Sequence, residues 1–146
     1  MPEFNLQEER RIYLDGIRLF NQGDFFEAHE AWEEVWKLAP DRRREQFYRA
    51  ITQTAVTLEL LRRGRAVGVR QVFVSSLKLF ESLPTVFMGL DIGAFCEQVR
   101  EAIRPALEDL QTRHVQIDPS KLFRIELAYD PFIESRAAEG VEIGPG

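Results

Sequence analysis

His29 and Glu33 are the residues of this chain whose types and spacing could do chemistry. They lie four positions apart, so on a helix their Cβ atoms are about 5–6 Å from each other. At that distance the carboxylate can accept a hydrogen bond from the imidazole and orient the ring. The pair could supply a general base or a metal ligand. The candidate pocket around this pair would be completed by neighbours on the same helix and on the next one: Glu30, Trp32, Trp36, Arg49 and Gln53.

Two interpretations of the pair follow from its helical position. On a helical wheel, His29 falls inside the apolar arc of Phe25, Trp32 and Trp36, which predicts an imidazole facing the interior beside two indoles. In the first interpretation, which we favour, His29 is a core histidine whose nitrogens are satisfied by Glu33 or a backbone carbonyl. In the second, the same residues form a ligand or metal site walled by the indoles. The residues alone leave both open.

Two known classes of metal site do not fit the residue pattern. A zinc-protease helix needs a second histidine four positions after the first, and Glu33 occupies that position. A di-iron bundle needs a Glu three positions before each histidine, where this chain has Phe26 and Gln111. We therefore assign no metal and no cofactor. A divalent metal held by His29 and Glu33 stays as the alternative, although these two fall short of the usual three protein ligands.

The elements that must position this motif are predicted to be helices. Apolar residues recur at three- and four-residue steps from the amino end to about residue 110. This pattern predicts an all-α, single-domain bundle of about five helices over residues 1–113. Residues 114–146 are predicted to form an extended carboxyl-terminal tail, with the last ten residues frayed. The five helices are expected at about Leu6–Asn21, Asp24 to Ala39–Pro40, Asp41–Arg63, Ala66–Leu83, and from Asp91 onward.

Local signals at the helix ends refine these expectations. Asp24 followed by Glu27 is a capping-box pattern for the second helix. Residues 84–90 are expected to form a loop. Asp91 is expected to cap the fifth helix, and Pro105 either kinks that helix or begins a new turn.

The third helix carries two apolar stripes. The main stripe is nearly opposite to the one formed by Val56 and Leu60. Two stripes indicate either a central place in the bundle or a second stripe that meets another copy in a homodimer. On a further face, Arg49 and Gln53 could point toward the second helix, which suggests an ion pair from Arg49 to Glu30 or Glu33.

Composition excludes several classes of partner. The 146 residues carry 19 Lys and Arg against 24 Asp and Glu, a net charge of −5, so no nucleic acid partner is expected. No apolar run approaches the roughly 18 residues of a spanning helix, so no membrane association is expected either. Cys96 is the single cysteine and cannot form an internal disulfide, which fits a reducing cytoplasm.

The central motif also resembles a known family. It reads Asn21-Gln22-Gly23-Asp24-Phe25-Phe26-Glu27-Ala28-His29-Glu30-x-Trp32-Glu33-x-x-Trp36, followed by Ile51-Thr52-Gln53-x-Ala55-Val56 and Arg63-Gly64. This pattern, within about Leu14 to Phe95, resembles the small helical proteins of domain of unknown function 309. The resemblance implies a compact helical bundle and no particular activity, and it implies that Gln53 lies near the His-Glu block.

The chain departs from this family at two places. Members often carry a further histidine late in the third helix, where this chain reads Leu58-Glu59-Leu60-Leu61, and Gly-Asn where it has Gly64-Arg65. These departures weigh against a two-histidine metal site here.

The function expected from these observations is a non-catalytic binding or interaction domain. Its partner would be a small molecule or a protein, and its His-Glu-Trp motif would be buried and mainly structural. The alternative is a metal-assisted or acid/base hydrolase, with His29 as base or ligand, Glu33 as its orienter and Gln53 as a substrate-positioning residue.

Overall fold

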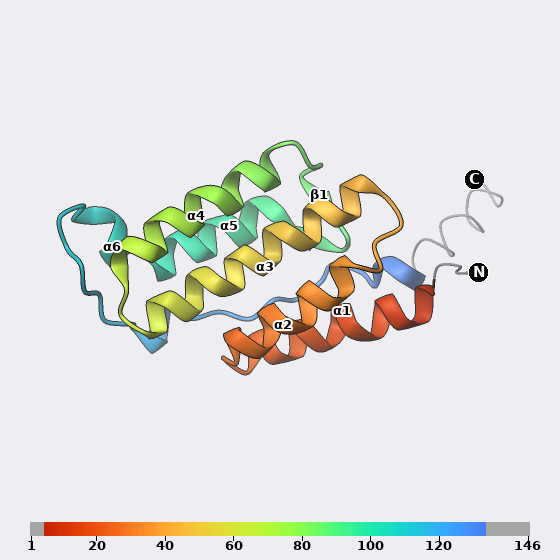
Figure 1. Ribbon diagram of the computed structural model, residues 1–146, viewed down its shortest axis with the longest axis horizontal. Coiled ribbons are helices and arrows are strands. Elements are labelled where there is room, and N and C mark those ends of the chain that lie inside the picture. Colours follow the sequence, from red (N-terminus) through yellow and green to blue (C-terminus); the bar gives the residue numbers. More distant parts are fainter. Residues whose placement is uncertain (1–4, 134–146) are drawn as a thin grey trace.

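The computed structural model describes residues 5–133, and these form a set of helices followed by a longer, mostly non-helical segment after residue 108 (Figure 1). The all-α prediction is confirmed, because the sheet consists of two strands of two residues each. The elements in chain order are α1 (Leu6–Asn21), α2 (Phe25–Trp36), α3 (Arg42–Arg62), α4 (Ala66–Glu81), β1 (Val86–Phe87), β2 (Leu90–Asp91), α5 (Ile92–Ala102), α6 (Arg104–Glu108) and the short 3-10 helix η1 (Pro119–Lys121).

The first two helices begin and end for local reasons. The Asn5 side chain caps α1 by accepting the Glu8 amide hydrogen at 3.0 Å. Gly23, with a φ of +86°, reverses the chain into α2. The capping-box prediction for Asp24 is wrong, because its side chain accepts no capping hydrogen bond. The second helix also ends at Trp36, ahead of the predicted stop near Ala39 and Pro40.

The later helix boundaries agree with the predictions to within a few residues. Asp41 caps α3 by accepting the Arg44 amide hydrogen at 2.9 Å, and Asp91 caps α5 in the same way as predicted. Gly64, with a φ of +78°, ends α3. The antiparallel β1–β2 hairpin spans 86–91 and so overlaps the expected loop at 84–90, and α4 ends before it at Glu81. Of the two alternatives for Pro105, the structure has a new helix, α6.

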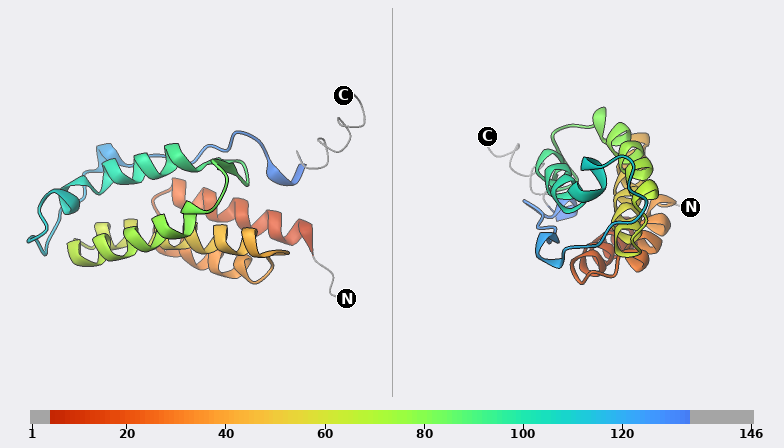
Figure 2. Two further views of the ribbon diagram at one scale, coloured as in Figure 1. Left: turned by 90° about the horizontal axis from the view of Figure 1, so that it is seen from above. Right: turned by 90° about the vertical axis from the view of Figure 1, so that its left-hand side faces the viewer.

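Helix α3 is the central element of the bundle. It packs between α2 and α4, and the three lie side by side in one row (Figure 1). Helices α1 and α5 lie on one side of this row, as the two further views show (Figure 2). The predicted main stripe of α3 is buried on that side: Phe47, Ala50, Ile51, Thr54, Leu58 and Leu61.

The second stripe of α3 remains partly accessible. Val56 and Leu60 are half-buried, since α2 and α4 flank them without closing over them. The central position of α3 therefore accounts for its two stripes without a second copy of the chain. The homodimer stays a prediction.

The chain after α6 runs back along the bundle and is held against α1 (Figure 2). Asn21 forms two hydrogen bonds with the backbone of Ile125, donating to its oxygen at 3.0 Å and accepting from its nitrogen at 2.6 Å. Arg10 pairs with Asp130 at 2.6 Å. Ile125 and Phe132 are buried in the core. The frayed end predicted for 137–146 lies outside the described residues.

No helix within residues 5–133 is both long enough and apolar enough to cross a membrane.

Candidate functional site

The Trp32 side chain does not lie beside His29 as predicted but packs against α1. Its side chain is fully buried, and its Nε1–H donates to the Tyr13 carbonyl at 3.2 Å. The indole lies directly on the α1 backbone, since a Cβ added at Gly16 would come within 2.2 Å of the Trp32 Nε1 atom. Trp32 thus joins α1 to α2 as part of the core.

His29 lies on α2 beside Val56 and Leu60 of α3, and 19% of its side chain is exposed. Its Nδ1 lies 3.0 Å from the Phe26 carbonyl oxygen, which only accepts, so Nδ1 carries the proton and Nε2 points away. The distance from Nε2 to the Glu33 Oε2 atom is 3.5 Å, and Glu33 is half exposed. The aromatic ring packed on the imidazole is that of Phe26, with 5.3 Å between centroids.

This position differs from the expected interior one beside two indoles. The helical wheel places His29 and Trp32 on one arc, but α1 covers only the Trp32 part of that arc. The motif is therefore not one buried His-Glu-Trp cluster.

The remaining candidates form a separate group at the other end of α2. The Trp36 Nε1–H donates to Glu45 at 3.1 Å, and the Arg49 guanidinium lies 5.4 Å from the Trp36 ring centroid. Among the described residues Arg49 makes no ion pair with Glu30 or Glu33, so that expectation is wrong. Stacking on the indole is the contact that Arg49 makes instead.

Gln53 and Glu30 do not complete a polar pocket with His29. The Gln53 Oε1 atom is buried and has no hydrogen-bond partner among the described residues. Glu30 is exposed. Within residues 5–133 no three His, Cys, Asp or Glu side chains are placed to hold a metal ion together.

An apolar groove, here called the α2–α3 groove, lies beside His29. Its volume is about 200 Å³, and its floor is the second stripe of α3. Of the candidates named from sequence, only His29 lines it. Sequence reasoning missed the other members, although the stripe of Val56 and Leu60 was a usable signal. The lining residues are Phe26, His29, Val56, Glu59, Leu60 and Arg63.

Glu59 organises the charged rim of this groove. It is 6% exposed and accepts hydrogen bonds from Arg62 at 2.9 and 2.5 Å and from the Arg63 Nε at 2.7 Å. The Arg62 hydrogen bonds outweigh burial and, with Arg63, hold the pKa of Glu59 below its ordinary value.

The Arg63 guanidinium is held on one side by Glu59, and its terminal nitrogens are available to bind a ligand. Its Nε is bound to Glu59, and its guanidinium carbon lies 6.0 Å from the Phe26 ring centroid. Its two terminal nitrogens have no hydrogen-bond partner among the described residues. A guanidinium held in this way can bind a carboxylate with two parallel hydrogen bonds.

A second cavity, here called the basic pocket, adjoins the groove at the junction of α3 and α4. Its volume is about 570 Å³, and it shares Leu60 and Arg63 with the groove. Three arginines and a histidine line it, and no acidic residue does. The lining residues are Leu60, Arg63, Gly64, Arg65, Val67, Gly68, Arg113 and His114.

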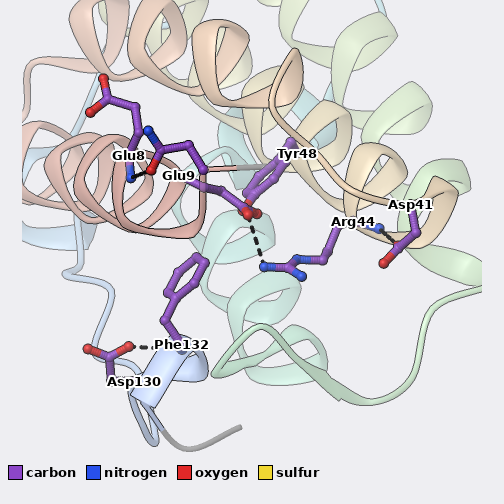
Figure 3. A network of polar contacts seen from close by, with 8 residues as sticks. Glu8, Glu9, Asp41, Arg44, Tyr48, Asp130 and Phe132 are labelled. Atoms are coloured by element: carbon purple, nitrogen blue, oxygen red, sulfur yellow. Dashed lines mark hydrogen bonds and ion pairs between the residues drawn. The ribbon is translucent and has the colours of Figure 1, made fainter. Parts of the chain in front are cut away.

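Sequence reasoning also missed a buried polar cluster that joins α1 to the amino-terminal part of α3 (Figure 3). The fully buried Glu9 accepts hydrogen bonds from the Tyr48 hydroxyl and from the Arg44 Nη2 at 3.0 Å. Arg44 also lies 5.5 Å from the centroid of the Phe132 ring. The usable signal was periodicity, because Glu9 precedes the buried Ile12 by three positions on α1.

Burial governs the protonation of this cluster. It raises the pKa of Glu9 above the ordinary 4.5, and the hydrogen bonds from Tyr48 and Arg44 offset part of that rise. Burial and the neighbouring carboxyl also raise the pKa of Tyr48 well above its usual range. The cluster joins α1, α3 and Phe132 of the carboxyl-terminal segment, so its arrangement suits a structural role.

Comparison with known proteins gives a family without an assigned activity. Uncharacterized protein YpuF of Bacillus subtilis (strain 168) is 27% identical over 121 residues, which cover 81% of this chain and 69% of YpuF. An uncharacterized protein of Aquifex aeolicus (strain VF5) is 28% identical over 97 residues, which cover 64% of this chain and 29% of that protein. The family model "Domain of unknown function (DUF309)" matches residues 13–72. The resemblance noted in the sequence is thereby confirmed over residues 13–72, the part of this chain that matches the DUF309 family model.

Proposed function

We propose that this chain is a non-catalytic interaction domain that binds a segment of a partner protein in the α2–α3 groove. The observation that carries the proposal is the accessible apolar floor on the central helix. Val56 and Leu60 belong to α3, whose other face forms the core, yet they stay half-buried beside a Phe26 side chain that is 42% exposed. Apolar side chains gathered around a groove, with a charged rim, are typical of protein-binding surfaces.

The size of the groove favours a protein segment over an enclosed small molecule. Small-molecule sites are usually cavities of about 300–1,000 Å³ that bury most of the ligand. The α2–α3 groove alone is about 200 Å³ and opens into neighbouring hollows that share Phe26, Leu60 and Arg63 with it. An elongated ligand that places successive side chains along the surface fits this shape.

The hydrolase alternative uses the same histidine, but the surroundings of His29 are less suitable for catalysis than for binding. The Phe26 carbonyl accepts from Nδ1–H of His29, so Nε2 is the nitrogen that could act as a base, but the Glu33 oxygen 3.5 Å from Nε2 is itself an acceptor and does not orient it. Glu33 is half exposed to water, whereas acid/base catalysis gains from a site that excludes water. We therefore prefer an interaction role in which His29 forms one wall of the groove.

Peptide selection with a matched pair of variants tests this proposal. A random peptide library displayed on phage is selected against the wild-type protein, and the enriched peptides are measured against Phe26→Glu and Val74→Glu. Both wild-type residues are exposed, at 42% and 52%, but only Phe26 lines the groove. We expect binding to be lost in Phe26→Glu and kept in Val74→Glu. Circular dichroism confirms that both variants keep their helices.

Two results would contradict the proposal. One is the absence of enriched peptides, or equal binding to the two variants. The other is a stoichiometric metal in the purified protein that disappears in both His29→Ala and Glu33→Ala while the fold is kept. That second result would favour the hydrolase.

A further inference from the structure

We infer that the segment bound in the α2–α3 groove is an amphipathic helix with acidic residues at one end. This inference rests on the proposed function and names the chemistry of the partner. Its apolar side chains would lie in the groove, and its carboxylates would lie over the basic pocket.

The spacing of the groove residues matches a helix. Val56 and Leu60 of α3 and Arg63, the residue that follows its end, are spaced at i, i+4 and i+7, so they lie in one row. A helix laid alongside presents its own residues at the same spacing, which is the arrangement of helix-in-groove recognition. A partner is not expected to bind as an added β-strand, because the strands within residues 5–133 are only two residues long.

The basic pocket supplies charge complementarity at one end of that row. Arg63, Arg65 and Arg113 line it together with His114, and none of the other lining residues is acidic. The local charge is therefore positive although the whole chain carries −5. Charges of one sign in a hollow attract and orient a partner of the opposite sign.

The backbone holds these arginines in place. Residues 64–66 and 113–115 run antiparallel, with an isolated bridge between Arg65 and His114. The Ala66 amide donates to the Arg113 carbonyl at 3.2 Å, and the Val115 amide donates to Gly64 at 3.1 Å. Because the backbones of Arg65 and Arg113 are fixed side by side, binding an anion requires little ordering of the chain.

Continuity between groove and pocket sets the direction of the bound helix. Leu60 and Arg63 line both, so one helix can contact both at once. A third hollow shares Phe26 and Arg63 with the groove and is lined by Asp24, Glu27 and Glu59 as well as by Arg62 and Arg63. Its three acids outnumber its two arginines, whereas the basic pocket has arginines and no acid. The acidic end of the partner is therefore expected at the junction of α3 and α4.

Three synthetic helical peptides test the inference. Each is about 18 residues long, or roughly 27 Å as a helix, and each carries the same leucine face. The polar positions at one end are Glu in the first peptide, Gln in the second and Lys in the third. Affinities are measured by fluorescence anisotropy for the wild type, for Arg65→Glu with Arg113→Glu, and for Phe26→Glu. Arg42→Glu with Arg43→Glu is the control, because it changes the net charge equally at the other end of α3.

The inference expects the Glu peptide to bind the wild type about tenfold more tightly than the Gln peptide, with the difference shrinking as salt is added. Arg65→Glu with Arg113→Glu should reverse the order of the Glu and Lys peptides, and the control variant should keep the wild-type order. All binding should be lost in Phe26→Glu.

The outcomes that overturn the inference differ from those that overturn the proposed function. Equal affinities for the Glu and Gln peptides, with binding still lost in Phe26→Glu, would leave the interaction domain standing and remove the acidic partner. No binding of any peptide would overturn both. Binding to anionic phosphatidylglycerol vesicles without peptide binding would also overturn both, because the surface would then recognise a lipid.

Discussion

The Glu9 carboxylate on α1 accepts a hydrogen bond from the Tyr48 hydroxyl on α3, although 39 positions separate the two residues in the chain. Arg44, one turn before Tyr48, binds the other oxygen of the same carboxylate at 3.0 Å (Figure 3). The hydrogen bonds and the charge of Arg44 compensate a carboxyl group that has no exposed surface. The cluster thereby ties α1 to the amino-terminal part of α3, whereas the α2–α3 groove lies along its carboxyl-terminal part.

Removing the Tyr48 hydroxyl should destabilise the fold. Tyr48→Phe leaves the buried Glu9 carboxylate without one of its donors, which costs about 1–3 kcal/mol in the free energy of unfolding. Urea denaturation followed by circular dichroism measures this loss. Tyr129→Phe is the matched control, since Tyr129 is 37% exposed and should change stability by less than about 0.5 kcal/mol. Equal effects of the two substitutions would contradict a stabilising cluster.

The stability of the protein should depend on pH through Glu9. Burial holds its pKa above 4.5, so the folded state binds this proton more tightly than the unfolded state does. The contribution of the carboxyl to stability is complete below that ordinary value and is lost as pH rises through the raised pKa.

Glu9→Gln isolates this contribution because glutamine does not titrate. The free energy of unfolding of the wild type, minus that of Glu9→Gln, should fall as pH rises above the ordinary value of 4.5 and through the raised pKa. Urea titrations of both proteins across this range give the difference directly. A difference that does not vary with pH would show that Glu9 titrates alike in the folded and unfolded states.

Gly16→Ala should disrupt the contact between α1 and α2. The added Cβ would lie 2.2 Å from the Trp32 Nε1 atom, so the indole or the helix must move. Overpacking of this kind costs about 1–3 kcal/mol or more. Thermal unfolding followed by tryptophan fluorescence measures the shift.

Gly93→Ala provides the comparison for that substitution. It lies within α5, and its added Cβ would meet only the Asp91 Oδ1 atom at an ordinary 3.6 Å. Without a clash, alanine should raise helix stability by about 0.5–1 kcal/mol. A similar loss in both variants would mean that Trp32 does not lie against Gly16.

Asn21→Ala should loosen the carboxyl-terminal segment from α1. The variant loses the acceptor of the Ile125 amide, at 2.6 Å, and the donor to the Ile125 carbonyl. Hydrogen exchange at the Ile125 amide should therefore become faster, because that amide opens to solvent more often. Asn5→Ala removes the α1 cap instead and should leave exchange at Ile125 unchanged. Unchanged exchange in Asn21→Ala would show that other contacts suffice to hold the segment.

The amino-acid sequence by itself determined the helices and most of their ends. Leu6–Asn21 was predicted at both ends, because apolar periodicity and a left-handed Gly23 act within a few residues. Asp41 and Asp91 were recognisable caps for the same reason. The family motif was also readable, since it lies within one continuous block.

Only the tertiary structure decided which of those residues share a site. A helical wheel gives the direction of a side chain and not the element that covers it. Trp32 packs on α1 at Gly16, His29 lines the α2–α3 groove, and Trp36 packs against Arg49. Glu59 and Glu9 read as ordinary charges in sequence. The pairing of Glu59 with Arg62 and Arg63 follows a local spacing, but its burial depends on how the helices pack. The pairing of Glu9 with Arg44, 35 positions away, was decided by the packing of α1 against α3.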